Sequence, residues 1–165
     1  PEPFGVNLVK VDSARQMKEK VLENIPLASA LIMAAAVADF SPEEISKEKM
    51  KKGERILNLT MVKTEDILLE VAKNKIKTGF PNFTIGFAAE SENLLKNAKD
   101  KLLIKSLDLI VANDISKSHT GFLSDDNLVT IIDRNLQEKI YPVMSKYQVG
   151  ILLMEEITSL KGKNN

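Results

Sequence analysis

The chain has 165 residues, a length that fits a single substantial core, so we expect one domain over residues 1–165. Its 23 basic and 23 acidic residues cancel, which argues against nucleic-acid or membrane partners and leaves any anion to local charge clusters. Cysteine is absent, which excludes disulfides and thiolate nucleophiles, and no apolar run approaches the roughly twenty residues that span a bilayer, so we expect a cytoplasmic protein.

The first forty residues alternate between strand and helix patterns. Residues 5–12 (GVNLVKVD) alternate apolar with polar side chains and predict a strand. Ser13 then predicts the start of a helix that runs to residue 25, because apolar side chains recur there at helical spacing. Residues 29–39 (SALIMAAAVAD) carry almost no polar side chain and predict a strand covered on both faces.

The middle of the chain continues this alternation. Further apolar runs predict strands, and the amphipathic segments between them predict helices, the first of which is capped by Thr64. A β-α-β order of this kind predicts a mostly parallel sheet with helices on both faces. The expected strands are residues 56–62, 83–90 and 107–114, and the expected helices are residues 65–76 and 91–105.

The last part of the chain changes pattern. Residues 127–133 and 138–143 are separated by four polar or turn-forming residues and predict an antiparallel hairpin at the edge of the sheet. Residues 145–162 predict an amphipathic helix. Its apolar positions are Val149, Leu153, Ile157 and Leu160.

Three of the expected strands finish alike, passing from small or apolar residues to a polar one. These residues are Asp39, Glu90 and the pair Asn113 and Asp114. Ligands of open α/β sheets bind beyond the carboxyl ends of the strands, and alanines there leave room for a ligand. We therefore expect these ends to meet at one site. The alternative is that the alanines fit under a helix and each acid caps the next one.

Residues 47–55 (KEKMKKGER) carry five cations and two acids. A solvated loop is the simplest interpretation of such a polar segment. The segment nevertheless leaves directly from a strand end where we expect a ligand, and lysines there would stabilise the charge on phosphates or on departing pyrophosphate.

Other charged residues allow the same two interpretations. Lys101 and Lys105 are four residues apart, so they share a helix face that borders the apolar stripe, where a lysine either binds a ligand or only covers apolar surface. The amide groups after Thr64 would bind phosphate, unless the acids that follow it simply complement the helix dipole. We expect Lys63 and Lys99 to face solvent, and His119 to be exposed.

Several motifs are missing from the sequence. It has no Gly-x-Gly-x-x-Gly, no Walker-type phosphate loop, no Gly-x-Ser-x-Gly and no pair of histidines on a helix. These absences disfavour a dehydrogenase, a Walker-type ATPase and a serine hydrolase. The residues alone predict an α/β domain for a nucleotide or phosphate ligand.

Five motifs in order add a resemblance that covers essentially the whole chain. They are AAVADF followed by KMKK, then GFAAES, KLLIKSLDLIVAND and GFLSDDN. In this order and spacing they resemble the phosphopantothenoylcysteine synthetase domain of the bacterial bifunctional coenzyme A biosynthesis flavoprotein.

The resemblance implies a fold and a reaction. The fold is a Rossmann-like three-layer α/β sandwich that forms a homodimer, with the lysine segment acting as a flap. The reaction is a CTP-dependent ligase reaction, assisted by Mg²⁺ and without flavin in this domain. It joins 4′-phosphopantothenate to cysteine through an acyl-cytidylate. The alternatives are a non-catalytic nucleotide-binding or dimerisation module, and another nucleotide enzyme such as a sugar-nucleotide transferase.

The resemblance also implies site residues. Lys49 would be the catalytic lysine, Asp39 would lie near the ribose, the phosphates or Mg²⁺, and Phe87 would pack on the nucleotide. Lys101 and Lys105 would bind the triphosphate. The full set expected to bind nucleotide is Met33, Ala34, Ala35, Asp39, Lys49, Glu65, Asp66, Ile67, Leu68, Phe87, Lys101 and Lys105. Members of the family normally begin with an earlier strand and a Gly-rich turn, so we expect this chain to be a fragment of a longer one, the alternative being that a separate chain supplies that segment.

Overall fold

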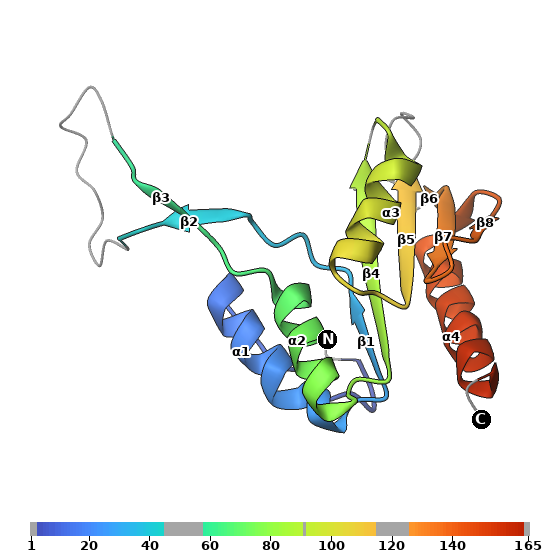
Figure 1. Cartoon of the computed structure of the whole chain (residues 1–165), viewed down its shortest axis with the longest axis horizontal. Coiled ribbons are helices and arrows are strands. Elements are labelled where there is room, and N and C mark those ends of the chain that lie inside the picture. Colours follow the sequence, from blue (N-terminus) through green and yellow to red (C-terminus); the bar gives the residue numbers. More distant parts are fainter. Residues whose placement is uncertain (1–2, 45–57, 91, 115–125, 164–165) are drawn as a thin grey trace.

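A computed structural model of the chain describes residues 3–44, 58–90, 92–114 and 126–163. Their main sheet has the spatial order β1 (Ala30–Met33), β4 (Phe83–Glu90), β5 (Leu109–Asp114), β7 (Val129–Asp133) and β8 (Glu138–Ile140) (Figure 1). The first three strands in that order run parallel, whereas β5 and β7, and then β7 and β8, pair antiparallel. The expected C-terminal hairpin is therefore confirmed, and it forms one edge of the sheet.

Helices cover both faces of this sheet. On one face lie α1 (Ala14–Asn24), which continues into the 3₁₀ turn η1 (Ile25–Leu27), then α2 (Ile67–Thr78) and α3 (Leu94–Ile104); on the other lies α4 (Lys146–Lys163). Strand β5 shows why both layers form. Leu109 and Val111 pack toward α4, while Ile110 and Ala112 pack toward the other helices, because side chains alternate across a strand. The expected three-layer α/β sandwich is thus confirmed.

A two-stranded ribbon extends away from these layers. It pairs β2 (Phe40–Pro42) with β3 (Met61–Lys63) in antiparallel register, and we call it the arm (Figure 1). The prediction that residues 56–62 form a strand of the parallel sheet is therefore wrong. Within the described residues the two arm strands pair only with each other, which leaves Phe40, Met61 and Val62 exposed.

Two further strand predictions need correction. Residues 5–12 pair with no strand in the part of the chain that the structure describes, and Val6 and Leu8 are exposed. An alternating pattern makes a strand possible, but a strand also needs a partner whose backbone groups it can bond. Of residues 29–39, only Ala30–Met33 are strand, and Ile32 is exposed rather than covered on both faces.

The helix predictions agree better with the structure. Ser13 caps α1 by accepting a hydrogen bond from the amide of Gln16 at 3.2 Å. The C-terminal helix follows a short ribbon of β6 (Asp126–Asn127) and β9 (Met144–Ser145). Its predicted apolar face is confirmed, since Val149, Leu153 and Ile157 are buried and Leu160 is partly buried against them.

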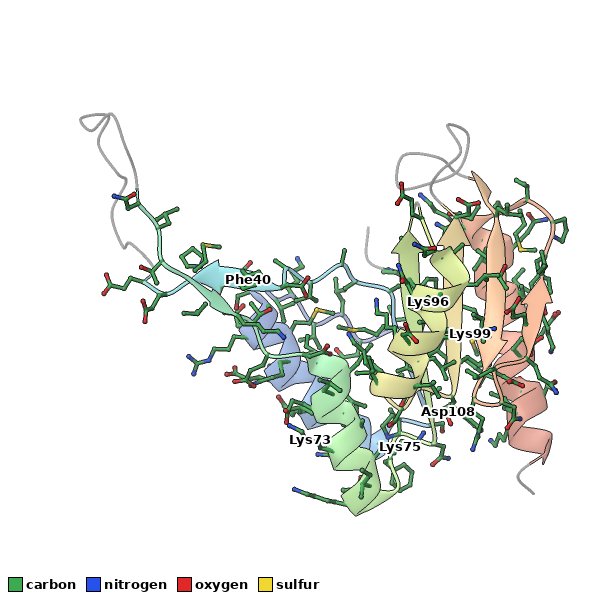
Figure 2. The ribbon with its side chains drawn as sticks, turned by 45° about the horizontal axis from the view of Figure 1, so that its top comes forward. Phe40, Lys73, Lys75, Lys96, Lys99 and Asp108 are labelled. Atoms are coloured by element: carbon green, nitrogen blue, oxygen red, sulfur yellow. The ribbon has the colours of Figure 1, made fainter. Side chains whose placement is uncertain are left out.

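The buried carboxylate of Asp108 contacts several elements at the end of the sheet where β5 begins. Asp108, just before β5, accepts hydrogen bonds at Oδ2 from Lys75 Nζ at 2.6 Å and from the amide of Thr84 at 2.7 Å (Figure 2). Its Oδ1 lies 3.3 Å from the guanidinium of Arg134 in the turn between β7 and β8. The residue thus joins α2, β4, β5 and the hairpin.

Candidate functional site

A cavity of about 370 Å³ lies beyond the carboxyl end of β1. Four separate segments line it: the chain after β1, the start of α2, the middle of β4 and the last turn of α3. The lining residues are Met33, Ala35, Ala36, Val37, Ala38, Asp39, Lys63, Thr64, Glu65, Asp66, Ile67, Leu68, Leu69, Phe87, Lys101 and Lys105. The location is the one where ligands of open α/β sheets bind.

The chain after β1 forms one wall from small side chains. Ala35 and Ala36 line the cavity, followed by Asp39 at the base of the arm, whereas the expected Ala34 is not among the lining residues. Methyl side chains leave room for a ligand beside the backbone. Two hydrogen bonds fix this wall to Thr64, the residue that follows β3, from the amide of Thr64 to Asp39 O at 2.8 Å and from Thr64 Oγ1 to Ala38 O at 2.5 Å.

The start of α2 differs from the expectation at two points. Asp66, not Thr64, caps the helix, and its Oδ1 accepts hydrogen bonds from the amides of Leu68 and Leu69 at 3.0 and 3.3 Å. The cap lies here because Ile67 and Leu68 are the first residues of the helix and are buried in the core. The amides expected to bind phosphate are therefore already bonded to a carboxylate of the chain itself.

Lys101 in the last turn of α3 and Lys105, the residue that follows the helix, both reach this region. Lys101 Nζ donates to the carbonyl of Phe87 at 2.8 Å, and Lys105 Nζ forms an ion pair with Asp66 Oδ2 at 2.7 Å. Both ammonium groups therefore make polar contacts, so these side chains do more than cover apolar surface. The expectation that Lys101 and Lys105 lie near Asp39 agrees with the structure, since all three line one cavity.

Asp66 carries the clearest electrostatic signature of the cavity. Burial by itself raises the pKa of its carboxyl. The hydrogen bond and charge of Lys105, together with the two helix amides, outweigh this effect and lower the pKa below the ordinary 3.8. Asp66 is therefore ionised at neutral pH and holds Lys105 in place.

The lining balances positive against negative charge. Lys63, Lys101 and Lys105 stand against Asp39, Glu65 and Asp66. Glu65 is itself engaged by Lys18 of α1, and the Lys18 side chain is largely covered. A polyanion in this cavity would therefore compete with the carboxylate that holds Lys105, or bring cations of its own.

Of the two lysines expected to face solvent, Lys63 is exposed as expected, whereas Lys99 is only partly exposed. Lys63 lines the cavity, because the pairing of β3 with β2 returns it to the chain that follows β1. Lys99 lies on α3 and forms an ion pair with Glu138 of β8 at 2.6 Å, and both side chains are only about one-third exposed (Figure 2). The cavity position of Lys63 and the ion pair of Lys99 have no local signal in the sequence, since each depends on contacts between distant segments.

The polar ends of β4 and β5 lie elsewhere. Met33, the last residue of β1, pairs with Gly86, so β4 continues for four more residues beyond the end of β1. At about 3.3 Å per residue, this places the backbone of Glu90 roughly 13 Å farther along the strand. Asn113 instead bonds Asn127 at 2.9 Å, and Asp114 lines a different surface depression. The expectation that all three ends meet is therefore wrong.

Some expected residues lie outside the described part of the chain. These are Lys49 with the rest of residues 47–55, and His119. Among the described residues, no group of three or more His, Asp or Glu side chains gathers in a way that would hold a metal ion. No helix in that part of the chain is long and apolar enough to cross a membrane.

Comparisons with known proteins place this geometry in a family. A family model described as the DNA/pantothenate metabolism flavoprotein C-terminal domain matches residues 1–160. The chain is 38% identical over 160 residues to the coenzyme A biosynthesis bifunctional protein CoaBC of Bacillus subtilis, covering 96% of this chain and 38% of that protein. It is 37% identical to the protein of the same name from Vibrio vulnificus, covering 98% and 40%. The chain thus spans about two-fifths of these relatives.

A solved structure agrees with these matches. The crystal structure of the C-terminal domain of a coenzyme A biosynthesis bifunctional protein CoaBC superposes with a TM-score of 0.75 at 29% identity. The superposition covers 98% of this chain and 71% of that one. The described sheet and helices are therefore the fold of that domain.

Proposed function

The chain belongs to the family of the DNA/pantothenate metabolism flavoprotein C-terminal domain, and from this premise we propose that it is a phosphopantothenate–cysteine ligase domain of coenzyme A biosynthesis. In the proposed reaction the carboxylate of 4′-phosphopantothenate attacks the α-phosphorus of CTP, and pyrophosphate leaves. The amine of cysteine then attacks the acyl carbon of the acyl-cytidylate, and CMP leaves. The reaction uses no flavin.

The observation that carries this proposal is that one cavity beyond β1 gathers most of the expected residues. Ten of the twelve residues expected to bind nucleotide line it, namely Met33, Ala35, Asp39, Glu65, Asp66, Ile67, Leu68, Phe87, Lys101 and Lys105. In the proposed complex Phe87 packs on the base, and Lys101 and Lys105 bind the phosphates. Lys49 stabilises the negative charge on the carbonyl oxygen and on departing CMP.

The donor set also suits a magnesium ion that arrives with the triphosphate. Proteins usually hold Mg²⁺ through one or two carboxylates together with substrate phosphates. Because Glu65 and Asp66 are engaged by Lys18 and Lys105, Asp39 is the carboxylate that would hold it. The ion would neutralise part of the phosphate charge.

Nucleotide-dependent stabilisation tests the proposal. A ligand that binds only the native state raises the melting temperature by mass action, so CTP with Mg²⁺ should raise it more than ATP, UDP-glucose or NAD at equal concentration. Equal shifts for all four would contradict a CTP site. Pyrophosphate release on adding 4′-phosphopantothenate then separates an enzyme from a nucleotide-binding module, because a silent module binds CTP without releasing pyrophosphate.

We also propose that the chain forms a homodimer through the arm. The arm extends from the main body and exposes Phe40, Met61 and Val62 to 56%, 47% and 39%. Figure 2 shows Phe40 on this ribbon. Apolar side chains gathered on a short ribbon of this kind are typical of a surface that another chain covers.

A further inference from the structure

Lys63 is the last residue of the arm, and residues 64–66 lead from it into α2. It lines the same cavity as Lys101 and Lys105, but it belongs to the arm, whereas they lie at the end of α3. Its side chain is exposed, but it has the cavity beside it rather than solvent alone.

The backbone around Lys63 is held firmly. Lys63 pairs with Phe40 in the arm, and the next residue, Thr64, bonds both Ala38 and Asp39 as described above. These contacts fix the Cα of Lys63 beside the alanine wall of the cavity. Only the four-carbon side chain is left to move, which suits a cation that follows a phosphate group.

The ammonium groups around the cavity differ in what they already bind. Lys105 is held by Asp66, and Lys101 donates to the carbonyl of Phe87. Within residues 3–44, 58–90, 92–114 and 126–163, no hydrogen bond or ion pair engages the ammonium of Lys63. An anion at Lys105 must displace a carboxylate, whereas an anion at Lys63 displaces no contact made by those described residues.

The three lysines line the cavity from two segments, Lys101 and Lys105 from the end of α3 and Lys63 from the end of the arm. Lys101 contacts the carbonyl of Phe87, and Lys105 contacts Asp66. A triphosphate bound between the two segments, with Lys101 and Lys105 on one side, would meet Lys63 on the other.

We propose that Lys63 is a further phosphate-binding residue, which holds the β- and γ-phosphates of the nucleoside triphosphate, the part that leaves as pyrophosphate. This assignment rests on the proposed function for the nucleotide. The recognition itself requires only an ammonium group at the wall of the cavity and a polyphosphate tail. Lys63 would stabilise the charge that accumulates on pyrophosphate as the bond to the α-phosphorus breaks.

Calorimetric titration of variants tests this role. Lys63→Met keeps most of the side chain's bulk but removes one charged hydrogen-bond donor, so binding of CTP should weaken roughly tenfold. Binding of CMP, which lacks the β- and γ-phosphates, should not change. Lys63→Arg should retain most of the CTP affinity. Lys77→Met is the matched control, because Lys77 is an exposed lysine near the end of α2 that does not line the cavity.

Inorganic tripolyphosphate serves as a second probe and separates the two proposals. Weaker tripolyphosphate binding by Lys63→Met than by the wild type supports the role of Lys63, even if CTP does not bind and the proposed function fails. Equal affinities of the two proteins for tripolyphosphate and CTP overturn the role of Lys63 and leave the proposed function standing. An equal loss for CMP and CTP also overturns it, and so does a wild type that binds neither probe.

Discussion

Asp66 combines three contacts in one side chain. It caps α2, it holds Lys105, and it lines the cavity. Thr64 was predicted as the cap, whereas the structure uses Asp66, two residues later, and local chemistry suits either residue type. The buried pair Ile67 and Leu68 decides between them, because the helix must begin where its apolar face can enter the core.

Two substitutions separate the contacts of Asp66. Asp66→Ala removes both the cap and the ion pair and should lower the free energy of unfolding by about 1–2 kcal/mol. Asp66→Asn should cost less, because asparagine also caps helices. Urea denaturation at neutral pH measures both values. A larger loss for asparagine than for alanine would contradict a capping role.

The stability difference between the wild type and Asp66→Asn should depend on pH in one direction. The pKa of Asp66 is lower in the folded state, so its contribution is fully present above the unfolded value near 3.8. The contribution is lost as the pH falls below 3.8 through the lowered folded pKa. The two unfolding free energies should therefore converge in acid, and a constant difference between pH 7 and pH 2 would contradict the ion pair.

Residue roles were predictable only where the signal is local. The spacing of Lys101 and Lys105 beside an apolar stripe suffices to place both on one helix face toward the sheet. Lys63 had no such signal, because its place depends on the pairing of Met61–Lys63 with a segment some twenty residues earlier. Lys99 depends in the same way on a partner in β8.

Helices and strands, too, were predictable only where their signal is local. Helices α2, α3 and α4 and strands β4 and β5 were predictable, because the periodicity of their own residues matches the core that covers them. The arm was not predictable as an arm, because residues 56–62 carry the apolar composition of a buried strand. A strand is defined by its partner, and no local pattern identifies the partner.

The contacts of Asp108 with α2, β4 and the hairpin make a prediction at this scale. Asp108→Ala leaves the buried amide of Thr84 without its acceptor and leaves the ammonium of Lys75 with only the carbonyl of Asn82, which should cost about 2–4 kcal/mol of unfolding free energy. Arg134→Ala is the control, because that side chain is half exposed and should cost less than about 1 kcal/mol. Urea denaturation measures both, and equal losses would show that Asp108 does not act through its buried contacts.

At the scale of the whole molecule, the proposed homodimer depends on the arm. Met61→Asp places a charge among the exposed apolar side chains and should shift the sedimentation coefficient from that of a dimer to that of a monomer. The melting temperature measured at low concentration should change little, because Met61 lies outside both core clusters. A dimer that persists in this variant would place the interface elsewhere.

The contacts of Thr64 with Ala38 and Asp39 have a consequence for the assembled molecule. They join the base of the arm to the wall of the cavity. Dimerisation through the arm and nucleotide binding in the cavity should therefore be coupled. Thermodynamic reciprocity then requires that a nucleotide which strengthens dimerisation binds more tightly to the dimer than to the monomer. Titration of Met61→Asp with CTP measures this coupling, and an affinity equal to that of the wild type would show that the two ends act independently.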